Sequence, residues 1–247
     1  MSRKINNLVP SAFTLLNLFF GFFAIISAIQ EKYVTASWMI IIAGIWDALD
    51  GKVARKTQSY SEFGIQLDSI VDMVSFGVAP AVLVYEVFFY KLGPSGIVLS
   101  FLPMMFGAIR LARFNVTLDG FEKESFSGLP IPAMAATLST YVIFNYDIWE
   151  GLKFGPLLIP LVVFLCILMV SNVEYEGVPK FSFKENKKNS VLFILVLLAV
   201  AVAVVFRERM LFPMAFGFVL FYFIRSLVLG FKEDEEDEEL FDISIPD

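Results

Sequence analysis

Long apolar runs are the feature that most limits how this chain can fold. Measured against the roughly 20 apolar residues that a membrane-spanning helix needs, the runs predict about eight helices. They cover approximately residues 10–29, 33–56, 63–90, 94–114, 130–147, 155–171, 190–206 and 210–231. Composition agrees, because 57% of the 247 residues are hydrophobic and the mean hydropathy is +0.73. We therefore expect an all-α polytopic membrane protein. Its expected partner is the lipid bilayer, and no nucleic-acid partner is expected.

The positions of lysine and arginine predict the orientation in the membrane. With eight helices, one side would carry five of the 19 basic residues, and the other side would carry the remaining 14. The five are Lys32, Lys91, Lys153, Arg207 and Arg209. Because cytoplasmic loops are enriched in Lys and Arg, the richer side is expected to face the cytoplasm. Both termini would then be cytoplasmic, in a multi-pass protein of the cell membrane.

The sequence divides into four regions. Residues 1–173 form the expected membrane core, and residues 174–189 are polar and predict a cytoplasmic linker. Residues 190–231 predict two additional transmembrane helices. The run Glu233–Glu239 is entirely acidic, so residues 232–247 are expected to form an acidic, disordered tail.

Two residue types are nearly absent, and this restricts the chemistry. The chain has no histidine, which excludes a His general base, a Ser-His-Asp triad and His metal ligands. Its one cysteine, Cys166, lies in an apolar run, and we interpret it as a small apolar residue within a helix. Catalysis would have to rely on carboxylates, Lys, Arg, Tyr or hydroxyl groups.

Two pairs of aspartates flank a short polar turn. Asp47 and Asp50 are three residues apart, and Asp68 and Asp72 are four apart, so each pair shares one face of a helix. Because the turn is short, the two helices should be antiparallel neighbours with all four carboxylates near one point. Unrelated surface acids beside a loop are the simpler explanation.

Energetics favour a metal site over that explanation. An acid within a membrane span costs on the order of 2.5–3.5 kcal/mol, and four converging acids also repel one another. Divalent cations would balance the charge, and oxygen ligands suit Mg²⁺, Mn²⁺ or Ca²⁺, of which we expect Mg²⁺ or Mn²⁺. The sequence therefore predicts a site for one or two such ions.

Glycine and alanine surround these acids in a recognisable pattern. The spacing D-x2-D-G-x2-A-R-x8-G-x3-D-x3-D resembles the signature of the CDP-alcohol phosphatidyltransferase family. The matching residues are Asp47, Asp50, Gly51, Ala54, Arg55, Gly64, Asp68 and Asp72. The resemblance covers roughly residues 5–171.

The resemblance implies a six-helix core around a cavity open to the cytoplasm, in a protein that is commonly a homodimer. It implies that the four aspartates bind metal, that Asp72 is also the general base, and that a CDP-linked lipid is the substrate from which CMP leaves. Gly51, Ala54 and Gly64 would line the cytidine pocket, and Lys52 and Arg55 would meet the phosphates. Without histidine, direct in-line displacement is expected in place of a covalent intermediate.

A second cluster bears on the acceptor alcohol. Arg110, Arg113 and Asn115 end the fourth predicted helix, and Gly-Leu-Pro-Ile-Pro-Ala follows at 128–133. Together with Thr14 and Asn17 in the first helix, they are similar to the phosphatidylserine synthase branch of the family. By that resemblance, Thr14 and Asn17 would bind the CDP-lipid, and Arg110, Arg113 and Asn115 would bind L-serine.

Other interpretations remain open at this point. Two arginines at a helix end are also explained by snorkelling and topology, and an acceptor such as glycerol phosphate or inositol phosphate would suit them equally. The donor is CDP-diacylglycerol or an ether-lipid analogue. From a different class, a divalent-cation transporter also places acids on facing helices, although here they lie near one membrane face. A catalytically silent scaffold is disfavoured by the intact signature.

Overall fold

The structure is a computed structural model in which residues 2–57, 62–119, 128–173, 175 and 207–243 are described. Within these ranges, the side chains of 2–11, 54–57, 62, 116–119, 207 and 229–243 are not described. The described residues contain helices and no strand. The predicted linker, apart from Tyr175, and the predicted span 190–206 lie outside them.

Seven segments build the first part of the fold. They are α1 (Ser2–Ile29), α2 (Tyr33–Thr57), α3 (Glu62–Asp72), the π-helix η1 (Met73–Val78), α4 (Ala79–Val87), the 3-10 helix η2 (Phe89–Leu92) and α5 (Pro94–Asp119). The second part comprises α6 (Ile131–Trp149), η3 (Gly155–Leu157), α7 (Leu158–Val170), η4 (Arg207–Met210) and α9 (Leu211–Ile243). The expected helix over 63–90 is thus α3, η1 and α4 in direct succession.

Five of these helical stretches are long and apolar enough to cross a membrane. They are Ala12–Ile29, Tyr33–Val53, Phe63–Val87, Pro94–Asn115 and Glu208–Val228, and the shorter Gly155–Val170 is also apolar. The prediction of an all-α polytopic membrane protein is confirmed.

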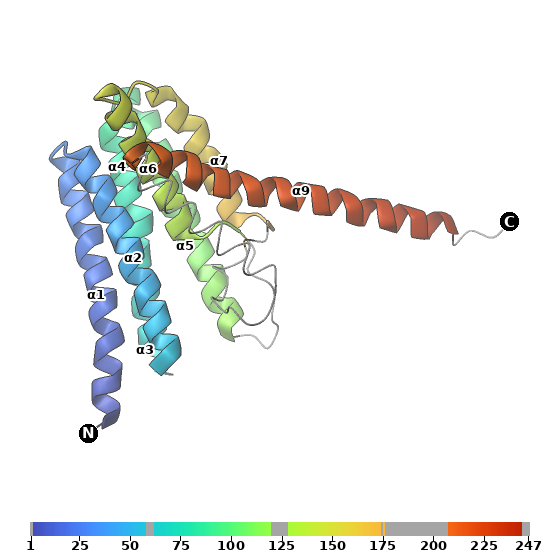
Figure 1. The fold of residues 1–247 in the computed structure, drawn as a ribbon, viewed down its shortest axis with the longest axis horizontal. Coiled ribbons are helices and arrows are strands. Elements are labelled where there is room, and N and C mark those ends of the chain that lie inside the picture. The colour runs from blue at the N-terminus through green and yellow to red at the C-terminus, as the bar shows by residue number, and fades with distance from the viewer. Residues whose placement is uncertain (1, 58–61, 120–127, 174, 176–206, 244–247) are drawn as a thin grey trace.

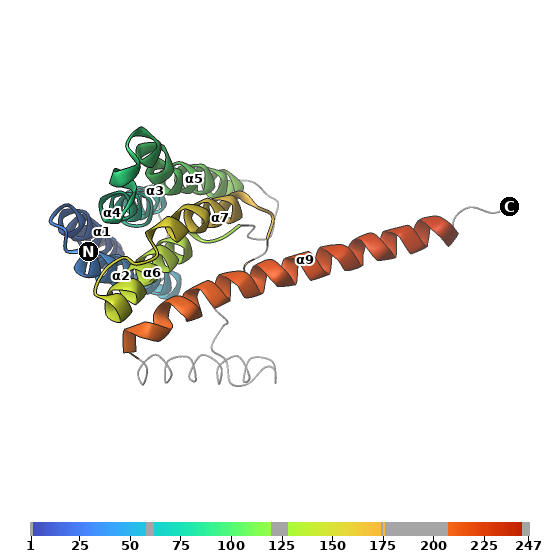
Figure 2. The same ribbon diagram turned by 90° about the horizontal axis from the view of Figure 1, so that it is seen from above.

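The helices α1 to α7 form a bundle, which Figures 1 and 2 show from two directions. The most extensive contact joins α1 to α2, and α2 in turn packs on α6 while α5 packs on α7. Small buried residues of α1 and α2 contribute to the core; they include Ala24, Ala28, Ala36 and Ala43. Small side chains let helix backbones approach closely inside a membrane, where packing replaces the hydrophobic driving force.

The π-helix begins directly after Asp72 and packs on α1. Ser75 Oγ donates a hydrogen bond to the backbone oxygen of Asn17 over 3.1 Å. Gly21, one turn beyond Asn17, allows this approach, since a Cβ there would lie 2.8 Å from the Ser75 Cα. Single π-helical turns are uncommon and often occur at functional sites.

The Gly-Leu-Pro turn before α6 is attached to the end of α7. The Gly128 amide donates to the Val173 carbonyl and the Leu129 amide to the Leu168 carbonyl, each over 2.9 Å. Gly128 has a φ of +92°, which favours glycine. The start of α6 is therefore fixed relative to the C-terminal end of α7.

The last helix differs from its expected extent. α9 leaves the bundle and projects away from it (Figure 1), and it continues through the acidic run to Ile243. The division of the chain that makes residues 232–247 a disordered acidic tail stays a prediction. Glutamate is a good helix former, which lets a helix that is already nucleated continue.

The close contact at Gly21 gives a stability prediction. We expect Gly21→Ala to destabilise the protein by about 1–3 kcal/mol, because its methyl group overlaps Ser75. Thermal unfolding in detergent measures this effect. Gly217→Ala in α9 is the control, since a methyl group there meets no described atom within 4 Å. Equal melting temperatures for both variants would contradict the packing.

Candidate metal centre

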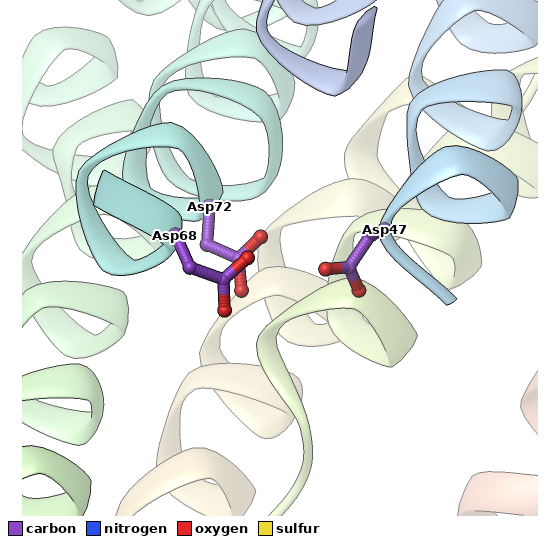
Figure 3. A group of neighbouring side chains, drawn as sticks. All are labelled: Asp47, Asp68 and Asp72. Atoms are coloured by element: carbon purple, nitrogen blue, oxygen red, sulfur yellow. The ribbon is translucent and has the colours of Figure 1, made fainter. Parts of the chain in front are cut away.

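Asp47 of α2 and Asp68 and Asp72 of α3 bring their carboxylates together. One oxygen from each lies within 4.8 Å of the other two. Figure 3 shows Asp68 and Asp72 side by side on one helix, facing Asp47 on its neighbour. The four-residue spacing puts Asp68 and Asp72 on one face of α3, and Asp47 lies opposite them on α2.

Asp50 is held differently from these three. Its side chain is 6% exposed, and its Oδ2 accepts a hydrogen bond from Thr14 Oγ1 of α1. It interacts electrostatically with Asp47 and Asp68, so it borders the cluster without belonging to the group of three. The expected set of four therefore divides into three gathered carboxylates and one that is bonded to α1.

Asn17 provides a second link from α1. It is fully buried, and its Nδ2 donates to Asp72 Oδ1 over 3.3 Å. Its Oδ1 has no hydrogen-bond partner among the described residues. Thr14 and Asn17 lie three residues apart, so one face of α1 donates to one aspartate of each pair. The expectation that both polar residues face the site agrees with these contacts.

Arg110 of α5 is a positively charged residue that interacts with Asp72. The two side chains interact electrostatically. The Arg110 Nε is buried and has no hydrogen-bond partner among the described residues. Arg110 thus offers positive charge beside the cluster, with one N–H still available to an acceptor.

The other two expected acceptor residues have separate partners. Arg113 is exposed, and its Nη1 donates to the Val170 carbonyl at the end of α7 over 3.2 Å. Asn115 Nδ2 donates a hydrogen bond to Ser69 Oγ over 3.1 Å. Ser69 directly follows Asp68 in the sequence. The structure therefore brings Asn115 to the helix of the aspartates and turns Arg113 toward α7.

The remaining motif residues lie in the last turns of α2 and the first turn of α3. Gly51 and Gly64 are half-buried, and Lys52 is exposed. The side chains of Ala54 and Arg55 lie outside the described part of the chain. Their roles toward a nucleotide stay predictions.

The three gathered carboxylates suit a divalent metal ion. Oxygens on opposite sides of Mg²⁺ lie about 4.2 Å apart, twice the bond length of about 2.1 Å. A spread of up to 4.8 Å needs only small side-chain adjustments to reach this geometry. All donors are carboxylate oxygens, which hard cations prefer, so the residues fit Mg²⁺ or Mn²⁺.

Two supporting residues were not predicted from the sequence. Ser69 pairs with Asn115, and Ser75 fixes the backbone of Asn17. Each serine lies one to three residues after an aspartate of α3, and a polar residue in an apolar span is the signal that could have indicated them.

The family model for CDP-alcohol phosphatidyltransferase matches residues 7–173, about two thirds of the chain. The chain belongs to this family. Its match ends before η4 and α9.

Several relatives carry related names. A CDP-diacylglycerol–serine O-phosphatidyltransferase of Helicobacter pylori is 39% identical over 228 residues, which are 91% of this chain and 93% of the relative. An archaetidylserine synthase of Methanothermobacter thermautotrophicus is 33% identical, over 71% of this chain and 73% of the relative. A CDP-diacylglycerol–serine O-phosphatidyltransferase of Saccharomyces cerevisiae is 38% identical, over 58% and 56%.

The gathered carboxylates give a prediction about metal binding. Asp68→Asn should weaken Mn²⁺ binding at least about tenfold to 100-fold, since even loss of a partner of a ligand has effects of that size. Titration followed by electron paramagnetic resonance in detergent measures this change. Glu86→Gln in α4 is a matched control outside the cluster, and unchanged affinity in Asp68→Asn would contradict the site.

Proposed function

We propose that the protein transfers a phosphatidyl group from CDP-diacylglycerol, or an ether-lipid analogue, to the hydroxyl of L-serine and releases CMP. The cluster of Asp47, Asp68 and Asp72 beside Arg110 carries the proposal, because it combines a metal site with a cation next to a base. The printed activities of bacterial, archaeal and yeast relatives support serine as the acceptor.

Asp47, Asp68 and Asp72 would hold Mg²⁺ or Mn²⁺, and Asp50 would complete the set for one or two ions. Bound there, the metal would supply positive charge to the diphosphate and its leaving CMP. Thr14 keeps the Asp50 carboxylate oriented by hydrogen bonding, and Asn17 does the same for Asp72.

Asp72 is the proposed general base. An alcohol has a pKa far above 7, so a carboxylate within hydrogen-bond reach must take its proton as the new bond to phosphorus forms. Asp72 is 9% exposed, lies beside Arg110 and keeps one oxygen bonded to Asn17. Because the chain has no histidine, this carboxylate takes the role that histidine has in many enzymes.

Arg110 is the proposed partner of the serine carboxylate. A guanidinium pairs well with carboxylates, and its buried Nε has an unused N–H. Asn115 would complete the acceptor site next to Asp68, with Arg113 in a supporting position near α7.

The donor would occupy the side of the site formed by α1, α2 and the first turn of α3. Its proposed contacts are Thr14, Asn17, Gly51, Lys52, Ala54, Arg55 and Gly64. We propose direct in-line displacement, since Cys166 lies buried in α7 and the chain offers no histidine nucleophile.

The proposed orientation in the membrane rests on the distribution of Lys and Arg along the chain. The excess of Lys and Arg supports a cell-membrane protein with both termini and the active site cytoplasmic. The family resemblance supports a homodimer.

The activity itself can be measured on purified protein. We expect CMP release that requires Mg²⁺ or Mn²⁺, CDP-diacylglycerol and L-serine together. Release only with glycerol 3-phosphate or inositol phosphate would overturn the acceptor. Ion flux in liposomes without lipid turnover would overturn the enzyme class.

Asp72→Asn tests the base. We expect kcat to fall by about 10²–10⁴-fold, the usual contribution of general base catalysis, while the CDP-lipid still binds. Asp147→Asn, in α6 and ion-paired with Arg209, is the matched control. Full activity in Asp72→Asn would remove this residue as the base.

Arg110→Ala tests the acceptor contact. We expect the KM for serine to rise about tenfold to 100-fold, as for a lost hydrogen bond to a charged group, and the KM for the CDP-lipid to change much less. Arg209→Ala, an exposed arginine of η4, is the control. An equal rise in both KM values would instead place Arg110 on a phosphate.

A further inference from the structure

The C-terminal end of α7 is a point where three segments of the bundle meet. A helix leaves its last four carbonyls without partners inside the helix. Two of them are bonded here from outside α7. The Leu168 carbonyl accepts from the Leu129 amide over 2.9 Å and from Ser171 Oγ over 2.8 Å. The Val170 carbonyl accepts from Arg113 Nη1 over 3.2 Å. The end of α7 is therefore joined both to the turn before α6 and to α5.

Arg113 supplies a positive charge that this helix end lacks. α7 contains no charged residue of its own. The carbonyls at the C-terminus of a helix carry partial negative charge, so a cation there is stabilising. Arginine side chains also bond such carbonyls directly. The contact with Val170 thus makes Arg113 a cap of α7, and a bound substrate is not needed to explain where its side chain lies.

The Gly-Leu-Pro turn fits closely against the same helix end. Its Gly128 amide donates to the Val173 carbonyl over 2.9 Å, and a Cβ on Gly128 would overlap the Met169 carbonyl oxygen. Gly128, Leu129 and Met169 are all buried. We call this set of contacts the α7 joint; it comprises Arg113, Gly128, Leu129 and residues 168–173. Because the contacts share one helix end, a shift of α7 there moves all of them.

Arg110 lies one turn before Arg113 on α5 and has a different environment. Its Nε is buried, and its side chain interacts electrostatically with Asp72. Arg113 is exposed and is bonded to α7 instead. The two arginines belong to one continuous stretch of helix. The bond that fixes Arg113 to α7 therefore also limits where Arg110 can lie relative to Asp72.

We infer that Arg113 is a positioning residue: it caps α7 and, through the α7 joint, holds α5 so that Arg110 stays beside Asp72. The inference rests on the proposed function, in which Arg110 binds the serine carboxylate. The two arginines then have different tasks, since Arg110 touches the substrate and Arg113 acts through Arg110. The Gly-Leu-Pro turn gains a role as well, because it bonds the start of α6 to the same joint.

Hydrogen–deuterium exchange without substrate tests the cap. We expect Arg113→Ala to speed exchange of the Leu129 and Ser171 amides about threefold to tenfold, as for the loss of one hydrogen bond. Arg113→Lys should exchange nearly as the wild type does, because a lysine also places a cation at the helix end. Arg209→Ala is the control: it removes an exposed arginine bonded to Asp147 in the last turn of α6 and should leave these amides unchanged.

Turnover tests the link to Arg110. We expect Arg113→Ala to lower kcat/KM for serine about tenfold through misplacement of Arg110, and Arg113→Lys to recover most of that loss. Ser171→Ala loosens the joint from the α7 side and should lower the same constant, although this residue has no proposed substrate contact. In an Arg110→Ala background, Arg113→Ala should cost little more, since the group that it positions is already gone.

Three results would overturn the inference and leave the proposed function standing. Unchanged amide exchange in Arg113→Ala would mean that this residue does not hold the joint. Faster exchange with unchanged turnover would mean that the joint does not position Arg110. An undiminished loss in the Arg110→Ala background would place Arg113 on the substrate itself.

Two further outcomes are distinguished from these. Where Arg113→Ala does not fold, Arg113→Gln, which keeps much of the side chain but not the charge, provides both readouts. A wild-type protein that releases no CMP from CDP-diacylglycerol and serine would refute the proposed function, and the positioning role would fail with it.

Discussion

Several carboxylates gathered inside membrane-spanning helices repel one another, and the rest of the site depends on how this charge is held. Each acid costs on the order of 2.5–3.5 kcal/mol at the centre of a span. Three of them meet between α2 and α3, and the interacting cation, Arg110, comes from a third helix. A divalent ion is what turns this arrangement from a destabilising one into a useful one, because it supplies the charge that one arginine cannot.

Support for the cluster comes largely from α1. Thr14 and Asn17 donate to Asp50 and Asp72, one aspartate from each pair. The π-helix brings Ser75 against the backbone of Asn17, and Gly21 provides the space for that contact. The geometry of the aspartate cluster is thus linked to the close packing of α1 on the segment that follows Asp72.

The sequence predicted the helical class, the facing pairs of aspartates and the polar face of α1, because each follows from residue spacing along a single helix. It did not predict that Asp50 bonds to Thr14 while the other three aspartates gather. Nor did it predict that Arg113 donates to the Val170 carbonyl while Arg110 interacts electrostatically with Asp72. These outcomes depend on side-chain rotamers and on contacts between helices distant in sequence. The π-helix also lacks a clear local signal, since apolar runs suit more than one helical conformation.

Anomalous diffraction from crystals grown with Mn²⁺ tests the central claim most directly. The account predicts a manganese peak among the carboxylates of Asp47, Asp68 and Asp72, with Asp50 close by and Arg110 on the Asp72 side. A manganese peak elsewhere in the protein, with no peak at these three carboxylates, would contradict it.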